Sequence, residues 1–218
     1  MLGLVTGYPY VSFFLLLILI LAGYEDIRRR KITTITFLVM DIALLFYYLF
    51  VDYWLAFLIL PVISEFFLKK ISLVAYAIIL IPLVFDLSVV TLSISYALLL
   101  AKLFGVLVKN FGRGDVKVLQ TIAVAMPLYP HLPVTDSLFP PVLSIALIAS
   151  AAGTVASLVV NALVKKAQIV QPLPTMANFR NETKFWTDGS RMTYKIPFVT
   201  FIAAGYAVIL ILSLLRLV

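Results

Sequence analysis

The stretch SVVTLSISYALLLAKLFGVLV, residues 88–108, contains only one charged side chain, Lys102. A helix of about 20 predominantly apolar residues is long enough to cross the hydrocarbon core of a bilayer. The rest of the chain has the same character: 63% of its 218 residues are hydrophobic, 12% are charged, and the mean hydropathy is +1.12. Soluble domains carry about 25% charged residues. The composition therefore predicts an integral membrane protein.

Similar apolar segments occur on both sides of this stretch. They cover residues 10–24, 33–50, 54–68, 71–85, 88–108, 116–129, 139–164 and 196–215. The segments 54–68 and 71–85 are short for a full span and could instead form a re-entrant hairpin, so six and eight crossings both fit. We expect an all-α, polytopic membrane helix bundle that forms a single domain over residues 1–218. The polar stretch 167–194 is expected to be a loop of this domain.

The distribution of basic residues predicts the orientation of the chain. All the lysines and arginines except Arg216 lie in or beside the connections after the first, third, fifth and seventh apolar segments. The other connections hold Asp52, Asp86, His131 and Asp136 and no basic residue. Because cytoplasmic loops are enriched in Lys and Arg, this pattern predicts an external N-terminus in the cell membrane. The charges are divided among short loops, so we expect lipid rather than nucleic acid as their partner.

The chain has few residue types that could carry out chemistry. It has no cysteine and one histidine, which excludes disulfides, thiol nucleophiles and cysteine- or histidine-rich metal sites. No metal or cofactor is expected. The N-terminus lacks the basic region and the cleavage site of a removable signal peptide, so its apolar segment is expected to stay as a helix. The remaining candidates are ten carboxylates.

Most of these carboxylates have an ordinary structural interpretation. Those in the polar connections are expected to be solvated or to cap helices, namely Asp52, Asp86, Asp136, Glu182 and Asp188. Glu65 lies four residues before Lys69, which predicts a local ion pair. Asp41 lies in the middle of an apolar segment. It is either a functional ionisable group or a protonated residue that bonds a neighbouring helix, and the sequence leaves both open.

Asp26 and Asp115 are the remaining pair. Asp26 ends the first apolar segment and Asp115 opens the sixth, so both are expected at one membrane depth. Two adjacent carboxylates can share a proton, so that one acts as a base on water while the other polarises a carbonyl. Gly112 and Gly114 are predicted to allow positive φ angles and close approach of another backbone. A Gly-x-Gly-Asp sequence before a helix is also typical of an ordinary N-cap, and this alternative stays open.

Three short motifs in the sequence resemble those of a known family. Residues 112–117, GRGDVK, are similar to the GxGD-x-K motif of the prepilin peptidases, which are membrane aspartyl proteases. Residues 26–32, DIRRRKI, and residues 195–201, KIPFVTF, resemble the first and last motifs of that family. The absence of cysteine makes the chain more similar to the archaeal preflagellin (prearchaellin) peptidases. Thr33 follows Ile32 where bacterial members often have proline, and the two aspartates are further apart than in the archaeal group.

The resemblance implies a membrane aspartic endopeptidase with Asp26 and Asp115 as catalytic residues and no cofactor. Its substrates would be type IV pilin-like or archaellin precursors, whose short basic leader is removed at the cytoplasmic face. It also implies motif or substrate-binding positions at Gly112, Gly114, Lys117, Pro197 and Phe198. Pro197 and Phe198 could equally serve helix entry and packing, and Arg113 and Lys117 could either keep one aspartate ionised or hold the interface.

Two other functions remain open on the sequence alone. A small ion-coupled transporter would use Asp41 and Asp26 as proton sites. A non-catalytic scaffold of a pilus or secretion machine would need none of the carboxylates. A protease should depend on Asp26 and Asp115 and tolerate Asp41→Asn, whereas the transporter should not.

Overall fold

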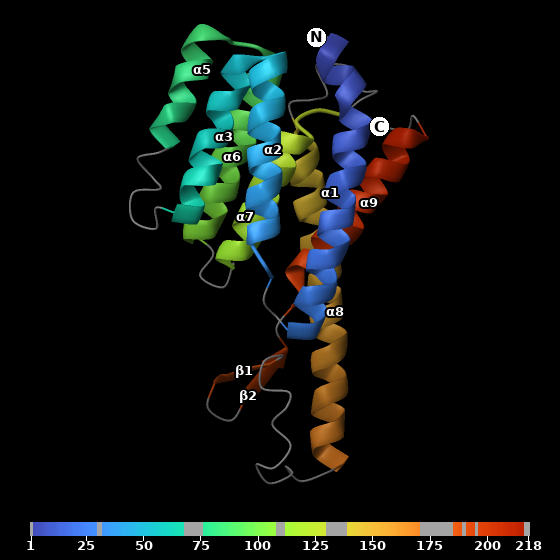
Figure 1. Ribbon diagram of the computed structural model, residues 1–218. Coiled ribbons are helices and arrows are strands. Elements are labelled where there is room, and N and C mark those ends of the chain that lie inside the picture. Colours follow the sequence, from blue (N-terminus) through green and yellow to red (C-terminus); the bar gives the residue numbers. More distant parts are fainter. Residues whose placement is uncertain are drawn as a thin grey trace.

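The computed structural model describes residues 2–29, 32–67, 76–107, 112–129, 139–170, 185–188, 191–194 and 196–215. The helices in these ranges are α1 (Leu2–Arg29), α2 (Ile35–Val51), α3 (Tyr53–Phe67), the 3-10 helix η1 (Tyr76–Ile79), α5 (Leu80–Phe85), α6 (Val89–Leu107), α7 (Arg113–Ala125), α8 (Pro141–Val170) and α9 (Phe198–Leu214). Figure 1 shows them as a bundle of roughly upright helices. Each of the eight predicted apolar segments contains helix, which confirms the helical bundle.

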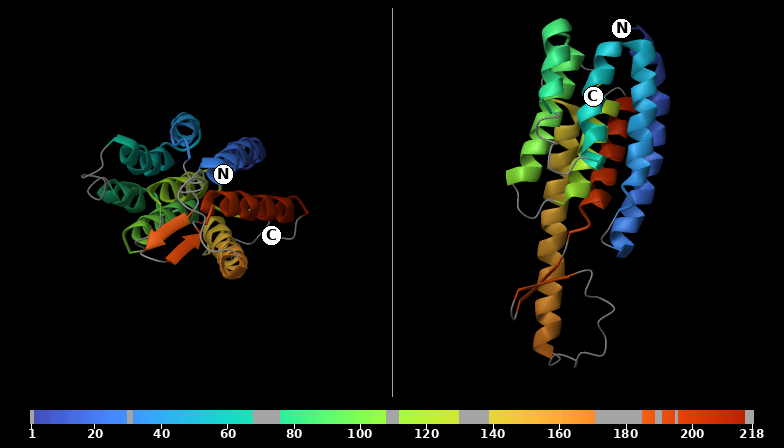
Figure 2. Two further views of the ribbon diagram at one scale, coloured as in Figure 1. Left: turned by 90° about the horizontal axis from the view of Figure 1, so that it is seen from below. Right: turned by 60° about the vertical axis from the view of Figure 1, so that its left-hand side comes forward.

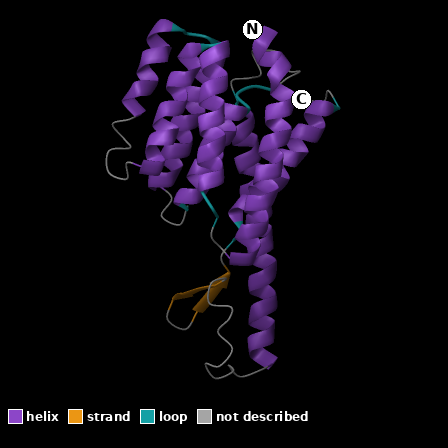
Figure 3. Ribbon diagram, in the orientation of Figure 1, coloured by secondary structure: helices purple, strands orange, loops and turns teal. Residues whose placement is uncertain are grey.

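The polar stretch 167–194 differs from the predicted loop. Helix α8 continues to Val170, and the strands β1 (Phe185–Asp188) and β2 (Arg191–Tyr194) form an antiparallel hairpin (Figure 3). Asp188 lies opposite Arg191 in the hairpin register. A two-stranded hairpin needs only a short local sequence with β-branched and aromatic residues, and it leaves the bundle itself all-helical. His131, Asp136, Glu182 and Lys69 lie outside the described residues.

Three of the helical stretches are long and apolar enough to cross a membrane. They are Tyr10–Arg29, Val89–Val106 and Pro141–Leu163. The shorter apolar helices Ile35–Val51, Tyr53–Phe67, Tyr76–Phe85 and Phe198–Leu214 pack beside them. Large apolar side chains face outwards along the bundle, with Leu17, Leu147 and Leu158 each more than half exposed. Such a surface is suited to lipid rather than to water.

The helices form two groups that meet at α7. In what we call the α9 group, α1 and α8 both pack against α9. In the α7 group, α2, α3 and α6 pack against α7, and η1 and α5 pack against α3 on its outer side. Helix α7 also contacts α1, α8 and α9, and Figure 2 shows it surrounded by the other helices. Its residues from Val118 to Ala125 are all buried, so α7 is the central helix of the molecule.

The α9 group is held by close backbone contacts. A Cβ atom added to Gly23 of α1 would lie 3.3 Å from the Cα of Thr200 in α9. The Thr200 hydroxyl donates to the Gly23 carbonyl at 2.9 Å, and the Tyr206 hydroxyl donates to the Ser12 carbonyl at 3.1 Å. Small residues allow helices in a membrane to approach in this way.

The α7 group is held by polar side chains. The Glu65 carboxylate accepts hydrogen bonds from Lys102 of α6 and from the Tyr76 hydroxyl of η1, the latter at 2.9 Å. Gln120 of α7 donates in turn to the Tyr76 hydroxyl, which links four helices. The sequence predicts Lys69, which lies outside the described residues, as a partner of Glu65. The structure shows an ion pair of Glu65 with Lys102, 37 positions later, which no local spacing could indicate.

Candidate active site

Four helix ends meet at one end of the bundle, the lower end in Figure 1: the end of α1 and the starts of α2, α7 and α9. Asp26 lies in the last turn of α1, and Asp115 lies in the first turn of α7. The predicted carboxylates therefore lie at the same end of the molecule. They come from different groups, because α1 belongs to the α9 group and α7 to the α7 group.

Asp26 joins α1 to the start of α9. Its side chain is 8% exposed, and Oδ2 accepts the backbone N–H of Val199 at 3.0 Å. Val199 is two residues after Pro197, the N-cap of α9. The first N–H groups of a helix have no partner within the helix, and the helix dipole is positive there, so a carboxylate is stabilised at this position.

Asp115 binds the start of its own helix. Its Oδ2 accepts the backbone N–H of Gly112, the N-cap residue of α7, at 3.1 Å. Gly112 has an extended backbone, with φ −68° and ψ 139°, so the predicted positive φ angle is wrong at this position. Its role is to provide space, because a Cβ atom would lie 2.7 Å from the Asp115 Oδ2. Asp115 is thus not the N-cap itself but the third residue of the helix, and it folds back onto the cap.

Gly114 also provides space, for a side chain rather than for the predicted backbone. A Cβ atom at Gly114 would lie 2.9 Å from the Cδ1 of Ile32, which precedes α2. Ile32 is followed by Thr33, which bonds back to α1. Glu25 accepts the backbone N–H of Thr33 at 2.8 Å and its hydroxyl at 3.1 Å. The first and second motifs of the sequence are therefore in direct contact.

Asp115 lies just before the apolar segment of α7, and burial is the largest influence on the pKa of its carboxyl group. It raises the pKa of Asp115 from its usual value of 3.8 to about 7, with the negative charge of Asp26 as the second cause. The hydrogen bond from Gly112 acts in the opposite direction. Asp26 and Asp115 are therefore within electrostatic reach of each other. A pair of carboxylates of this kind can hold one proton near neutral pH and titrates as a unit.

Lys117 lies away from this pair. Two residues along a helix correspond to a rotation of about 200°, so Lys117 faces the opposite side of α7 from Asp115. Its Nζ atom lies 3.9 Å from the centroid of the Phe66 ring in α3, and its charge acts on Asp41 in α2. Arg113 is exposed at the helix start.

Pro197 and Phe198 are placed at the entry of α9. Pro197 is the buried N-cap, and the partly buried Phe198 packs against the hydrophobic core. Their helix-entry role is thus visible in the structure. Sequence reasoning missed the two residues that position the pair, Glu25 and Val199. Glu25 directly precedes Asp26, and the hydroxyl residue eight positions later, Thr33, is the signal that could have indicated its role. Val199 contributes only its backbone, so no side-chain pattern could reveal it.

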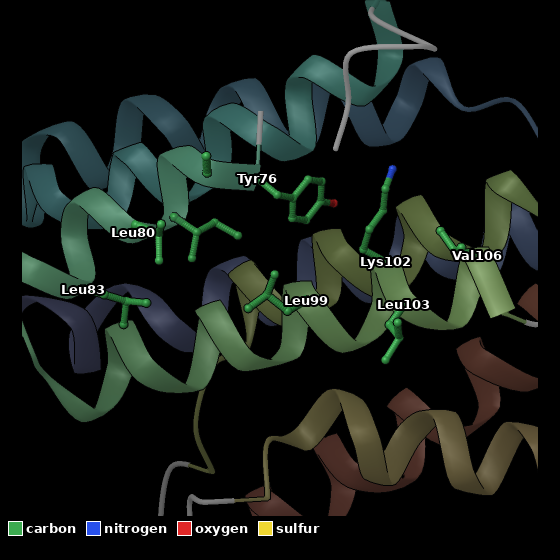
Figure 4. Close-up of a pocket in the computed structure, with 9 residues that line it drawn as sticks. Tyr76, Leu80, Leu83, Leu99, Lys102, Leu103 and Val106 are labelled. Carbon is green, nitrogen blue, oxygen red and sulfur yellow. The ribbon is translucent and has the colours of Figure 1, made fainter. Parts of the chain in front are cut away.

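A cavity of about 410 Å³ lies elsewhere. It is lined mainly by apolar residues of η1, α5 and α6, together with Tyr76 and Lys102 (Figure 4). None of its lining residues comes from α1, α7 or α9. In the part of the chain that the structure describes, no three His, Cys, Asp or Glu residues are grouped so that they could hold a metal ion. The Asp26–Asp115 pair is therefore the strongest candidate for chemistry.

No protein-family model matches the chain, and no curated protein or solved structure is significantly similar to it. The functional argument consequently rests on the local geometry. That geometry consists of two carboxylates, each accepting a hydrogen bond from a helix N-terminus, at the junction of two helix groups. Chemically, such a pair can act as a general base and a general acid on one bound water molecule.

Proposed function

We propose that the chain is a membrane aspartic endopeptidase. The observation that carries this proposal is the meeting of Asp26 and Asp115 at one end of a helix bundle, close enough for the charge of Asp26 to raise the pKa of Asp115. In a chain without cysteine and with a single histidine, a carboxylate pair is the simplest means of hydrolysing a peptide bond.

The surroundings of the two carboxylates favour different roles. Asp26 accepts the backbone N–H of Val199 and lies at the positive end of the α9 dipole. It is therefore assigned as the ionised base that removes a proton from water. Asp115, with a pKa of about 7, is assigned as the protonated acid that donates to the peptide carbonyl oxygen. The hydroxide equivalent adds to the carbonyl carbon to form a tetrahedral diol. Return of a proton to the amide nitrogen then breaks the C–N bond.

The proposed substrates are precursors of type IV pilin-like or archaellin subunits. This follows the resemblance of residues 112–117 to the GxGD-x-K motif. The chain would cross the cell membrane six to eight times with its N-terminus outside, which places the aspartates near the cytoplasmic face. A pair at the end of an apolar bundle fits a cut between a short basic leader and the apolar helix that follows it. The other partner is the bilayer itself.

A cleavage assay tests this proposal. The chain is co-expressed with a pilin-like precursor, and removal of the leader is followed as a size shift. Asp26→Asn and Asp115→Asn are the informative variants, because asparagine can still accept the N–H of Val199 or Gly112 but cannot exchange a proton. We expect each to lower the cleavage rate by at least about a hundredfold.

Asp52→Asn is the matched control. Asp52 also accepts a backbone N–H, that of Trp54 at 3.1 Å, but at the opposite end of α2. It should cleave like the unmodified chain. Full activity of Asp115→Asn would contradict the proposal.

An ion-coupled transporter is the second candidate, because Asp41 is fully buried in the bundle. It predicts that Asp41→Asn abolishes proton-driven uptake and that no precursor is cleaved. A scaffold would be indicated if neither Asp26→Asn nor Asp115→Asn changed the assembly of the machine that contains it.

A further inference from the structure

Asp41 is the one carboxylate in the described residues that lies fully inside the bundle without a hydrogen bond. It is 0% exposed, and neither of its carboxylate oxygens has a hydrogen-bond partner. Thr121 of α7 faces it, but the single hydroxyl proton of Thr121 is donated to the Lys117 carbonyl at 3.1 Å. A carboxylate in an apolar interior needs a compensating charge or must be neutral. An ionised Asp41 therefore needs a positive charge close to its carboxylate.

Lys117 is placed to do so. Helices α2 and α7 start at the same end of the bundle, and the Tyr48 hydroxyl of α2 donates to the Val124 carbonyl of α7 at 2.8 Å. Asp41 and Lys117 are each seven residues before these positions, two helical turns away on both helices, so they lie at one level. In agreement with this, the charge of Lys117 acts on Asp41.

Lys117 is also held from a second side. Its Nζ atom lies 3.9 Å from the ring centroid of Phe66 in α3, a favourable cation–π distance. The Lys117 side chain therefore lies between α2 and α3, on the face of α7 that points away from Asp115. A rotation of α7 about its axis would break these contacts and move Asp115 at the same time.

We propose that Asp41 and Lys117 form a charge pair between α2 and α7 that sets the rotation and height of α7, so that Asp115 faces Asp26. They are positioning residues, and the part of the inference that concerns cleavage rests on the proposed function. The proposal replaces the expectation that a protease tolerates Asp41→Asn.

The position of α7 can be measured without any substrate. The chain has no cysteine, so cysteines introduced at the exposed positions Ile27 of α1 and Arg113 of α7 can be labelled selectively with nitroxides. We expect Asp41→Asn to broaden or shift the distance distribution by more than about 1.5 Å, the rise of one helical residue. Asp52→Asn, the same substitution at the far end of α2, should leave it unchanged.

Two double variants distinguish the loss of the charge pair from a general loss of packing. Asp41→Lys with Lys117→Asp restores opposite charges at the two positions, and the distance distribution should return towards that of the unmodified chain. Asp41→Asn with Lys117→Gln removes both charges and should be no worse than either single variant. Additive effects in this second variant would overturn the proposal even if the exchanged pair failed to fold.

Cleavage gives the second readout. Asp41→Asn and Lys117→Gln should each lower kcat about tenfold to a hundredfold, because a small misplacement of a catalytic group has effects of this size. The residual activity should show a shifted upper limb of the pH–rate profile, which simple destabilisation would not produce. If the unmodified chain cleaves nothing, the proposed function fails while the label distances still decide the positioning role. Unchanged label distances in Asp41→Asn would overturn the inference.

Discussion

The α9 group and the α7 group are held together by different kinds of contact. In the α9 group, Gly23 brings two backbones together, and the hydroxyls of Thr200 and Tyr206 donate to main-chain carbonyls of α1. In the α7 group, side chains also bond to other side chains, with Glu65 and Lys102 as an ion pair. Backbone contacts are insensitive to ionisation, whereas a side-chain network depends on the charge of every member.

This difference matters because the two aspartates belong to different groups. Asp26 is placed by the rigid backbone contacts of α1 with α9. Asp115 is placed by α7, whose other face carries Lys117 over the Phe66 ring. Loss of a hydrogen-bonding or charged side chain should therefore cost more in the α7 group, whereas an added methyl group should cost more in the closely packed α9 group. Four experiments can test or refine this comparison.

The largest expected effect is that of Lys102→Met. It leaves the Glu65 carboxylate buried without its cation, and we expect the free energy of unfolding in detergent to fall by about 3 kcal/mol. The double variant Glu65→Gln with Lys102→Met should recover most of this loss, since no unpaired charge remains. Equal instability of the single and double variants would mean that the ion pair does not hold the α7 group.

The pH dependence of stability tests the junction between the groups. The pKa of Asp115 is raised in the folded chain, so its protonated form is favoured by folding. This contribution is complete below about pH 4 and is lost as pH rises through about 7. After allowance for partial exposure, we expect a loss of about 2 kcal/mol over this window.

The difference in unfolding midpoint between the unmodified chain and Asp115→Asn, measured from pH 4 to pH 8, isolates this contribution. The variant should be relatively more stable at the high end. A constant difference across the range would show that the carboxyl is not perturbed by burial and by Asp26.

Removing one tyrosine hydroxyl from each group gives a smaller effect. Tyr48→Phe should cost about 1.5 kcal/mol, because the Val124 carbonyl lies in the last turn of α7 and has no helical partner. Tyr206→Phe should cost only about 0.5 kcal/mol, because the Ser12 carbonyl lies inside α1, where it already accepts a helical hydrogen bond. Chemical unfolding of both variants measures the difference, and a reversed order would contradict it.

The smallest expected effect comes from adding a single methyl group. Gly23→Ala should destabilise the chain by about 1 kcal/mol, because the new Cβ meets the Cα of Thr200, which cannot move without α9. Gly114→Ala meets only the end of the Ile32 side chain, and it should change stability by less than about 0.5 kcal/mol. Equal losses of stability in the two variants would show that the Thr200 backbone and the Ile32 side chain are equally unable to move.

Much of the candidate site could be predicted because it depends on local features. Asp52 and Asp86 were expected at turns or caps, and the structure shows them accepting hydrogen bonds from Trp54 and Thr91. Asp26 and Asp115 were expected at one end of the bundle, and they lie there. The function of the two glycines was only partly foreseen. That they provide space was correct, but a side chain, not a second backbone, fills the space beside Gly114.

Other features could not be predicted because they join residues far apart in the sequence. The Glu65–Lys102 pair spans 37 positions, and the Asp26–Val199 hydrogen bond spans 173. The strands β1 and β2 were missed for another reason, since a short polar segment carries little periodic signal.

The sequence by itself determined that this chain forms an apolar helical bundle and which residues stand at the helix ends. Both are local properties, because apolar length and helix boundaries depend on neighbouring residues only. The tertiary structure alone decided which faces of the helices meet. The rotation of each helix about its axis is set by packing. In α7 it brings Asp115 within electrostatic reach of Asp26, while Lys117, two residues later, lies over the Phe66 ring of α3. A rotation of this kind leaves no trace in the order of the residues.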